Sequence, residues 1–176
     1  MHFRHHRARC RDQTAGWLHP RRCGNHPGLP RRANARSFHP PPRSFTVKNF
    51  PEDFRDLLKD ETKAFLFLAT IMPDGSPQVT PIWFNADDEH ILINTNEGRV
   101  KDRNILADPR VALVIQDPAT PYRYLQIRGE VVARATEGAD EHINTLSLKY
   151  DGKPWPYRAE QKRVIYKIRP RHYDQH

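Results

Sequence analysis

The sequence is poor in cysteine and has no long hydrophobic run. Its two cysteines, Cys10 and Cys23, both lie within the first 45 residues, so residues 46–176 can form no disulfide and tolerate a reducing compartment. No stretch approaches the roughly 20 consecutive apolar residues that a membrane-spanning helix requires. We therefore expect a soluble, cytoplasmic protein without membrane association.

Residues 46–176 also lack the motifs of hydrolases and of nucleoside triphosphate enzymes. They contain no Gly-x-Ser-x-Gly sequence, no Walker-type loop and no cysteine nucleophile. The four histidines show no metal-ligand spacing; they are His90, His142, His172 and His176. We predict no catalytic side chain and no metal site, and an enzyme of this kind would take its reactive atom from a cofactor.

The positive charge of the chain is confined to its N-terminal segment. Residues 1–45 hold ten arginines, no lysine and a single acid, Asp12, whereas the remaining residues hold 19 basic and 20 acidic side chains. The net charge of +8 therefore describes residues 1–45. Because residues 46–176 have almost no net charge, we expect no nucleic-acid partner for them.

We interpret residues 1–45 as a disordered tail and residues 46–176 as one folded domain. The tail is rich in Arg, Pro and His and lacks apolar periodicity. Weaker alternatives are a zinc site, an organellar transit peptide and an RNA-binding arm. A further hypothesis is that the tail is translated from upstream DNA and that the native product begins near Val47.

The apolar pattern of the folded domain begins with a short helix and three strands. Pro51 suits a first helical turn, and Phe54 and Leu57 follow at helical spacing, which predicts a helix up to residue 60. Apolar runs and alternation between turn residues predict strands at 64–72, 76–84 and 90–95. We expect these three strands to pair in sequence order as an antiparallel meander.

The second half of the domain predicts two more helices and three more strands. The helices are expected from residue 99 to 106 and, after the segment 138–140, from about residue 141 to 150–152. The strands are expected at 111–115, at 122–133 with a bulge at Gly129, and at 162–168. Six strands with short turns must hide their edges by closing on themselves, which favours a small antiparallel β-barrel with short helices.

Segment 95–101 combines the features of a phosphate-binding loop. A strand ends in hydroxyl and amide side chains, passes a glycine and enters a helix whose free N–H groups favour an anion, with two cations beside it. These residues are Thr95, Asn96, Gly98, Arg99 and Lys101. An ordinary N-cap followed by solvated charges would give the same pattern, and this segment alone favours that second interpretation.

A proline inside a strand is the second unusual feature. Pro81 leaves one ladder position without an N–H group, which usually marks an edge strand or a bulge. An exposed main-chain edge beside Trp83 could bind the polar rim of a flat heterocycle. An edge strand protected by proline, with Trp83 in the core or at a subunit contact, is the alternative.

Together, these segments resemble the pyridoxamine 5′-phosphate oxidase-like flavin and deazaflavin oxidoreductases, and most closely the short subgroup that uses coenzyme F420. The resemblance spans roughly residues 50–170. Its motifs are Ala69-Thr70-x-x-Pro73-Asp74-Gly75-Ser76-Pro77-x-Val79-Thr80-Pro81-x-Trp83-Phe84, Asn94-Thr95-x-x-x-Arg99-x-Lys101-x-Arg103-Asn104, Asp108-Pro109-Arg110-Val111 and Tyr124-x-x-x-Arg128-Gly129.

The resemblance implies a split β-barrel, as in FMN-binding proteins, that forms a homodimer with two sites at the interface. It implies that Arg99 and Lys101 hold the cofactor phosphate and that the segment around Trp83 lies along the ring. Tyr124, with Tyr122, is our candidate for a contribution from the second subunit. The complete set of implied cofactor-binding residues is Val79, Thr80, Pro81, Trp83, Asn94, Thr95, Asn96, Arg99, Lys101, Asn104 and Tyr124.

The resemblance further implies an oxidoreductase that transfers a hydride between bound coenzyme F420 and a small organic acceptor. FMN is the alternative cofactor, and non-catalytic binding or sequestration of a flavin or haem is the alternative function. The chain lacks the longer C-terminal region of true pyridoxamine phosphate oxidases, which argues against vitamin B6 synthesis.

Overall fold

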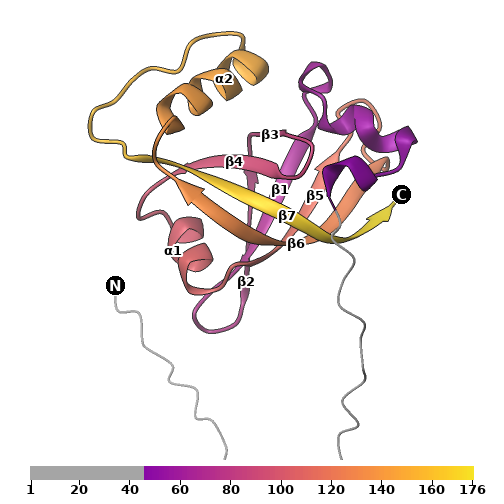
Figure 1. Ribbon diagram of the computed structural model, residues 1–176, viewed down its shortest axis with the longest axis horizontal. Helices are drawn as coiled ribbons and strands as arrows, with labels where there is room; N and C mark the ends of the chain where they lie inside the picture. The colour runs from indigo at the N-terminus through magenta and orange to yellow at the C-terminus, as the bar shows by residue number, and fades with distance from the viewer. Residues whose placement is uncertain (1–45) are drawn as a thin grey trace, which may run out of the picture. The chain divides into compact units, whose positions relative to one another are not determined.

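A computed structural model describes residues 46–176, which form one antiparallel sheet with short helices around it (Figure 1). The prediction of a disordered tail at residues 1–45 lies outside the described residues. The strands are β1 (Phe65–Ile71), β2 (Pro77–Ile82), β3 (Phe84–Ala86), β4 (Ile91–Asn96), β5 (Arg110–Gln116), β6 (Tyr124–Ala135) and β7 (Arg163–Gln175). Their order across the sheet is β2-β1-β5-β6-β7-β4-β3.

The two outermost strands of this sheet are consecutive in the chain, and this closes it into a barrel. β2 ends at Ile82 and β3 begins at Phe84, so Trp83 alone separates them. The β2 half pairs with β1, and the β3 half pairs with β4. The predicted fold class, a mainly β split barrel with short helices, is therefore confirmed.

The three strands predicted as a meander do pair in chain order, β1 with β2 and β3 with β4, but the middle strand is divided and β4 has a further partner. The strand expected at 76–84 bends at Trp83, and only its short second part, β3, pairs with the following strand. The main partner of β4 is β7, with six residue pairs from Ile91↔Ile168 to Asn96↔Arg163. Local periodicity does not show which distant strand pairs with a given strand, so the sequence did not predict the pairing of β4 with β7.

β6 and β7 form a long antiparallel pair, with α2 between them in the chain. Its register shifts between Arg128 and Gly129, where the bulge was predicted, and again between Val131 and Ala133. A side chain at position 129 would meet the backbone oxygen of Arg169 at 2.9 Å, which explains the glycine. β7 continues beyond the predicted end at residue 168 because Pro170 lies at this irregularity, where a missing N–H group is tolerated.

Two α-helices lie within residues 46–176, as the sequence predicts: α1 (Val100–Ala107) and α2 (Ala139–Asp151). The helix expected up to residue 60 is instead a series of 3₁₀ turns, namely η1 (Val47–Asn49), η2 (Glu52–Leu58) and η3 (Asp60–Thr62). Leu57 and Leu58 are the buried residues of η2, and short 3₁₀ pieces of this kind are common as connectors. Figure 1 shows α1 and α2 at one end of the barrel and the 3₁₀ turns at the other.

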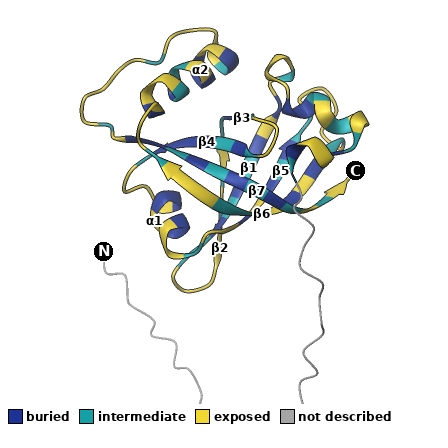
Figure 2. Ribbon diagram, in the orientation of Figure 1, coloured by how far each residue is buried: buried dark blue, intermediate teal, exposed yellow. Residues whose placement is uncertain are grey.

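The core consists of the inward-facing residues of the strands. Burial alternates along β1 and β5, with Leu66, Leu68 and Leu113 almost fully buried (Figure 2). Phe50 and Leu57 extend the same cluster from the 3₁₀ turns. The N-terminal turns therefore belong to the domain, and they close the end of the barrel away from α1. No helix in the described part of the chain is long and apolar enough to cross a membrane.

An arginine joins the 3₁₀ turns to the loop between β5 and β6. The Arg123 guanidinium donates to the carboxylates of Asp56 (2.6 Å) and Asp117 (2.8 Å). These hydrogen bonds lower the pKa of both carboxyl groups below their ordinary values. The contact thus stabilises the folded state only while both groups are ionised.

We expect the free energy of unfolding to fall as the pH drops below about 4, the ordinary aspartate pKa. Protonation then favours the unfolded state, in which both pKa values are higher. The Arg123→Gln variant should be less stable at pH 7 and should lose less stability on acidification. Urea denaturation between pH 3 and 7 measures both slopes, and parallel curves for the two proteins would contradict this assignment.

Candidate active site

A cleft of about 410 Å³ lies between the bend at Trp83, the start of α1 and the face of α2 that carries Ile143 and Tyr150. One half of its wall is apolar and aromatic, and the other is polar and cationic. The lining residues are Phe65, Leu66, Pro81, Ile82, Trp83, Asn94, Thr95, Arg99, Lys101, Ile143, Tyr150, Trp155 and Arg163. The structure thus brings six of the predicted site residues together: Pro81, Trp83, Asn94, Thr95, Arg99 and Lys101.

Three cations meet in the polar half of the cleft. Lys101 and Arg163 are buried, and neither forms an ion pair with any carboxylate of residues 46–176. Burial lowers the pKa of Lys101, and repulsion by Arg99 lowers it further. The pKa of Arg163 is lowered by the same two causes in the same order. Because like charges gathered without counter-charges are costly, this arrangement favours a bound anion.

Unsatisfied polar atoms surround these cations. Five buried side-chain atoms have no hydrogen-bond partner within the described structure: Thr80 Oγ1, Asn94 Oδ1, Thr95 Oγ1, Asn96 Oδ1 and Arg163 Nε. Three of these atoms belong to residues that line the cleft. Buried polar groups are normally paired, so a cluster of unpaired ones indicates a place where a polar ligand binds.

A network below α1 holds the loop that carries Arg99. Gly98 adopts a left-handed conformation with φ +76°, and its N–H donates to Asp102 Oδ2 at 2.8 Å. The other oxygen of Asp102 accepts from the Tyr166 hydroxyl at 2.6 Å. Burial and this hydrogen bond raise the pKa of Tyr166 to about 12, so its hydroxyl stays a donor. The loop is therefore fixed before any ligand binds.

The aromatic half of the cleft is built around the bend between β2 and β3. The Trp83 ring stacks on Tyr150, with centroids 5.5 Å apart and planes 6° apart, and meets Trp155 edge-on at 6.0 Å. The Tyr150 hydroxyl donates to the Ala64 carbonyl oxygen at 2.9 Å. Burial raises the pKa of Tyr150, which keeps the hydroxyl protonated. These contacts hold a flat apolar wall in place.

A half-buried histidine, His142, orients Asn94. The Asn94 amide donates to the Ala139 carbonyl oxygen at 2.8 Å and lies 3.4 Å from His142 Nδ1. The other ring nitrogen of His142 lies 3.0 Å from Asn85 Oδ1. Burial lowers the pKa of His142 to about 4, so the ring is neutral and Nδ1 can accept. The free oxygen of Asn94 is then left for a donor in the cleft.

The other predicted site residues lie outside the cleft lining. Val79 and Thr80 precede it on the edge strand β2, and Asn96 follows it at the end of β4. The Asn104 amide donates to Thr70 Oγ1 at 3.0 Å, which joins α1 to β1. Tyr124 stacks on His176 at 4.8 Å. Their roles in cofactor binding stay predictions.

Several lining residues were not expected from the sequence. Arg163 and Trp155 lie more than fifty residues beyond the predicted phosphate loop, on β7 and the segment that precedes it. Arg163 reaches the cleft because it pairs with Asn96 across β4 and β7. The sequence signal for Arg163 was its place at the start of the closing strand.

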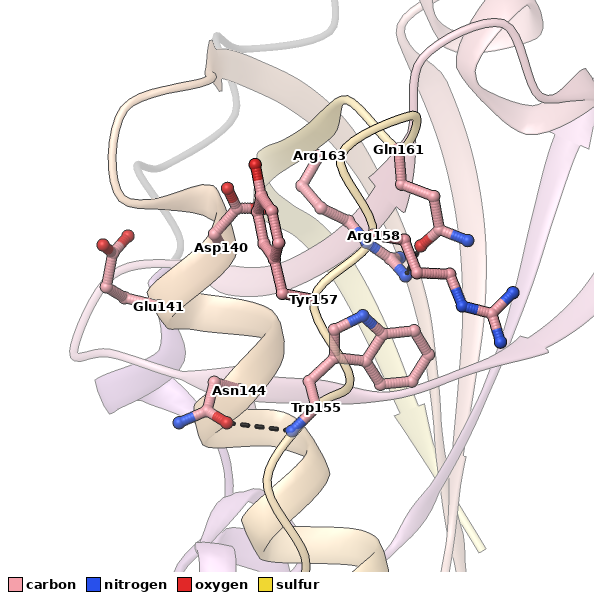
Figure 3. Close-up of a pocket in the computed structure, with 8 residues that line it drawn as sticks. All are labelled: Asp140, Glu141, Asn144, Trp155, Tyr157, Arg158, Gln161 and Arg163. Carbon is pink, nitrogen blue, oxygen red and sulfur yellow. Dashed lines mark hydrogen bonds between the residues drawn. The ribbon is translucent and has the colours of Figure 1, made fainter.

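A second, smaller cleft of about 260 Å³ adjoins the first and shares Trp155 and Arg163 with it (Figure 3). Its other lining residues are Asp140, Glu141, Asn144, Tyr157, Arg158 and Gln161. The backbone N–H of Trp155 donates to Asn144 Oδ1 at 2.9 Å, which ties the segment before β7 to α2. The Arg163 guanidinium packs 4.6 Å from the Trp155 ring centroid and donates to Gln161 Oε1 at 2.8 Å.

The closed antiparallel sheet with its short helices defines a split β-barrel. Residues 50–176 match the family described as pyridoxamine 5′-phosphate oxidase, so this chain belongs to that family. The resemblance predicted from the sequence motifs is confirmed.

Solved structures show the same fold. A protein named F420 reductase is 37% identical, with a TM-score of 0.64, and the match covers 71% of this chain and 98% of that chain. A conserved hypothetical protein from Mycobacterium tuberculosis is 25% identical, with a TM-score of 0.56, covering 76% and 88%. The HupZ protein of Group A Streptococcus is 19% identical, with a TM-score of 0.54 and coverage of 72% and 93%, and is similar in fold alone.

Proposed function

We propose that this protein is an oxidoreductase that transfers a hydride between coenzyme F420 and a small organic acceptor. The observation that carries the proposal is the cluster of Arg99, Lys101 and Arg163 beside an aromatic wall in one cleft. A deazaflavin has the same two parts, an anionic phosphodiester and a flat ring. The 37% identity to a protein named F420 reductase supports this cofactor over FMN, which is the alternative.

The residues of the cleft fit such a group. The three cations and Thr95 Oγ1 offer charge and hydrogen bonds to a phosphate, and the free N–H groups at the start of α1 add to them. Trp83, Tyr150 and the apolar side chains of β1 and β2 offer a flat surface to a ring. When bound, the cofactor would supply the hydride chemistry.

The protein's own part is to bind, orient and exclude water. No side chain is required as a nucleophile or as a general acid, because the reacting centre belongs to the cofactor. The Asp102–Tyr166 hydrogen bond holds the phosphate loop, and the Trp83–Tyr150 stack holds the ring wall. Fixing both ends of one ligand is the kind of positioning that accelerates a hydride transfer.

We also propose that the protein works as a homodimer. Phe65 and Val79 expose 50% and 59% of their surface beside the edge strand β2, close to the cleft. A second subunit would cover this apolar surface and could contribute Tyr122 or Tyr124 to the site. Tyr122 is 89% exposed, which is compatible with a contact to another chain.

Titration of the purified protein with coenzyme F420 and with FMN, followed by stopped-flow measurement of hydride transfer to a panel of quinones and unsaturated acceptors, tests the proposal. We expect tighter binding of F420 and turnover with at least one acceptor. Tight binding without turnover would favour sequestration of the ligand instead. Absence of binding to both cofactors would refute the proposal.

A further inference from the structure

The second cleft is electrostatically divided. Two carboxylates, Asp140 and Glu141, come from the first turn of α2, and two guanidinium groups, Arg158 and Arg163, come from the segment leading into β7 and from its first residue. Figure 3 shows the acidic residues on the helix side and the basic residues on the opposite side, with Trp155 and Tyr157 between them. The cleft therefore has opposite charges on opposite walls and aromatic rings between.

None of these four charges is neutralised by a direct ion pair. Within residues 46–176, neither Asp140 nor Glu141 is salt-bridged to a base, and neither Arg158 nor Arg163 is salt-bridged to an acid. The Asp140 carboxylate acts on Arg163 only at a distance and raises its pKa slightly against the effects of burial and Arg99. The two walls are thus within electrostatic reach but leave space between them.

Arg163, which lines both clefts, adds an observation on hydrogen bonding. This residue is 8% exposed, and its Nε has no hydrogen-bond partner in the described structure, although Nη2 is bound to Gln161. A buried guanidinium with an unused donor is a costly arrangement that an anionic ligand would relieve. Because Trp155 packs on the same guanidinium at 4.6 Å, the aromatic wall and the cation are held together.

We infer that this second cleft binds a small aromatic zwitterion, with an amino group at the α2 wall and a carboxylate at the Arg158–Arg163 wall. The ring lies against Trp155 and Tyr157. The volume of about 260 Å³ suits a single-ring molecule, because pockets for larger drug-sized ligands run from about 300 to 1,000 Å³. The inference does not depend on the identity of the cofactor in the first cleft.

Isothermal titration of the full-length protein with three probes tests this inference. The probes are 4-(aminomethyl)benzoate, which carries both charges, 4-methylbenzoate, which lacks the amine, and benzylamine, which lacks the carboxylate. We expect 4-(aminomethyl)benzoate to bind about tenfold or more tightly than either truncated probe, because each end adds a charge-assisted hydrogen bond. Equal affinities for the three probes would overturn the inference.

Variants of the two walls locate the binding. Arg158→Gln should reduce the preference for 4-(aminomethyl)benzoate over benzylamine, because Arg163 alone then faces the carboxylate, and Glu141→Gln should reduce its preference over 4-methylbenzoate. Lys153→Gln, an exposed change in the same segment outside the lining, is the matched control and should leave all three affinities unchanged. Preferences that stay unchanged in the Arg158 and Glu141 variants would place the probe elsewhere and refute the site. The assay contains no cofactor, so its failure leaves the proposed function untouched.

Discussion

Replacing Lys101 with alanine is expected to weaken cofactor binding by about 1.5 to 3 kcal/mol, the range for a hydrogen bond to a charged group. This corresponds to roughly a 10- to 150-fold increase in Kd. Lys101 is buried in the cleft and forms no ion pair within residues 46–176, so its charge is available to a ligand. Arg99→Ala should give a loss of the same size. Fluorescence titration with F420 and with FMN measures both changes.

Removal of Lys101 also relieves repulsion within the cation cluster, which distinguishes a binding role from a structural one. The unliganded Lys101→Ala protein should be as stable as the wild type or more stable, because burial and Arg99 oppose the charge of Lys101 in the folded state. Arg128→Ala, an exposed change outside the cleft, is the control and should alter neither property. Unchanged affinity in both cleft variants would remove the phosphate site from this loop.

Replacing Asp102 with alanine is expected to destabilise the protein by about 2 to 4 kcal/mol, because it removes two hydrogen bonds to a buried carboxylate. The Tyr166 hydroxyl, in a residue that is 1% exposed, would be left without its acceptor. The Gly98 N–H would also lose its partner, so the phosphate loop would become mobile. Urea denaturation measures the loss of stability.

The Asp102–Tyr166 pair can be separated from general packing by a double-mutant cycle. Tyr166→Phe removes the donor and keeps the ring, so Asp102→Ala should cost less in the Tyr166→Phe background than in the wild type. Cofactor affinity should fall in Asp102→Ala even under conditions in which the variant is fully folded, because the loop is no longer fixed. A change in unfolding free energy below about 0.5 kcal/mol, the usual scale of a neutral surface substitution, would contradict this assignment.

The separation of charge between the two parts of the chain bears on the choice of partner. Residues 46–176 have almost no net charge, yet the cleft gathers three cations and the neighbouring cleft carries both signs. Local electrostatics of this kind select a small charged molecule, whereas a polyanion requires an extended positive surface. We therefore retain a small-molecule ligand as the proposed partner of the folded domain.

The sequence predicted those parts of the site that are formed by residues close together in the chain. Turn residues and apolar periodicity located β1, β2, β4, β5, β6 and the start of β7 to within a few residues, but they did not predict β3 as a separate strand. The Thr95–Lys101 segment was recognised as a strand-to-helix junction with two cations. Pro81 was expected at a strand edge, and it lies on β2, which pairs with β1 alone along that stretch. Such features depend on residues close in the chain, so the local pattern contains them.

Only the tertiary structure showed how distant segments complete the site. The bend at Trp83 closes the barrel, and the β4–β7 ladder brings Arg163 beside Asn96, although 67 positions separate these two residues in the chain. The segment before β7 places Trp155 against Trp83. The residue types and their spacing along single strands determined the cationic loop and the edge strand. Long-range strand pairing, which no local pattern encodes, brought Arg163 and Trp155 to the same cleft as the cationic loop and the edge strand.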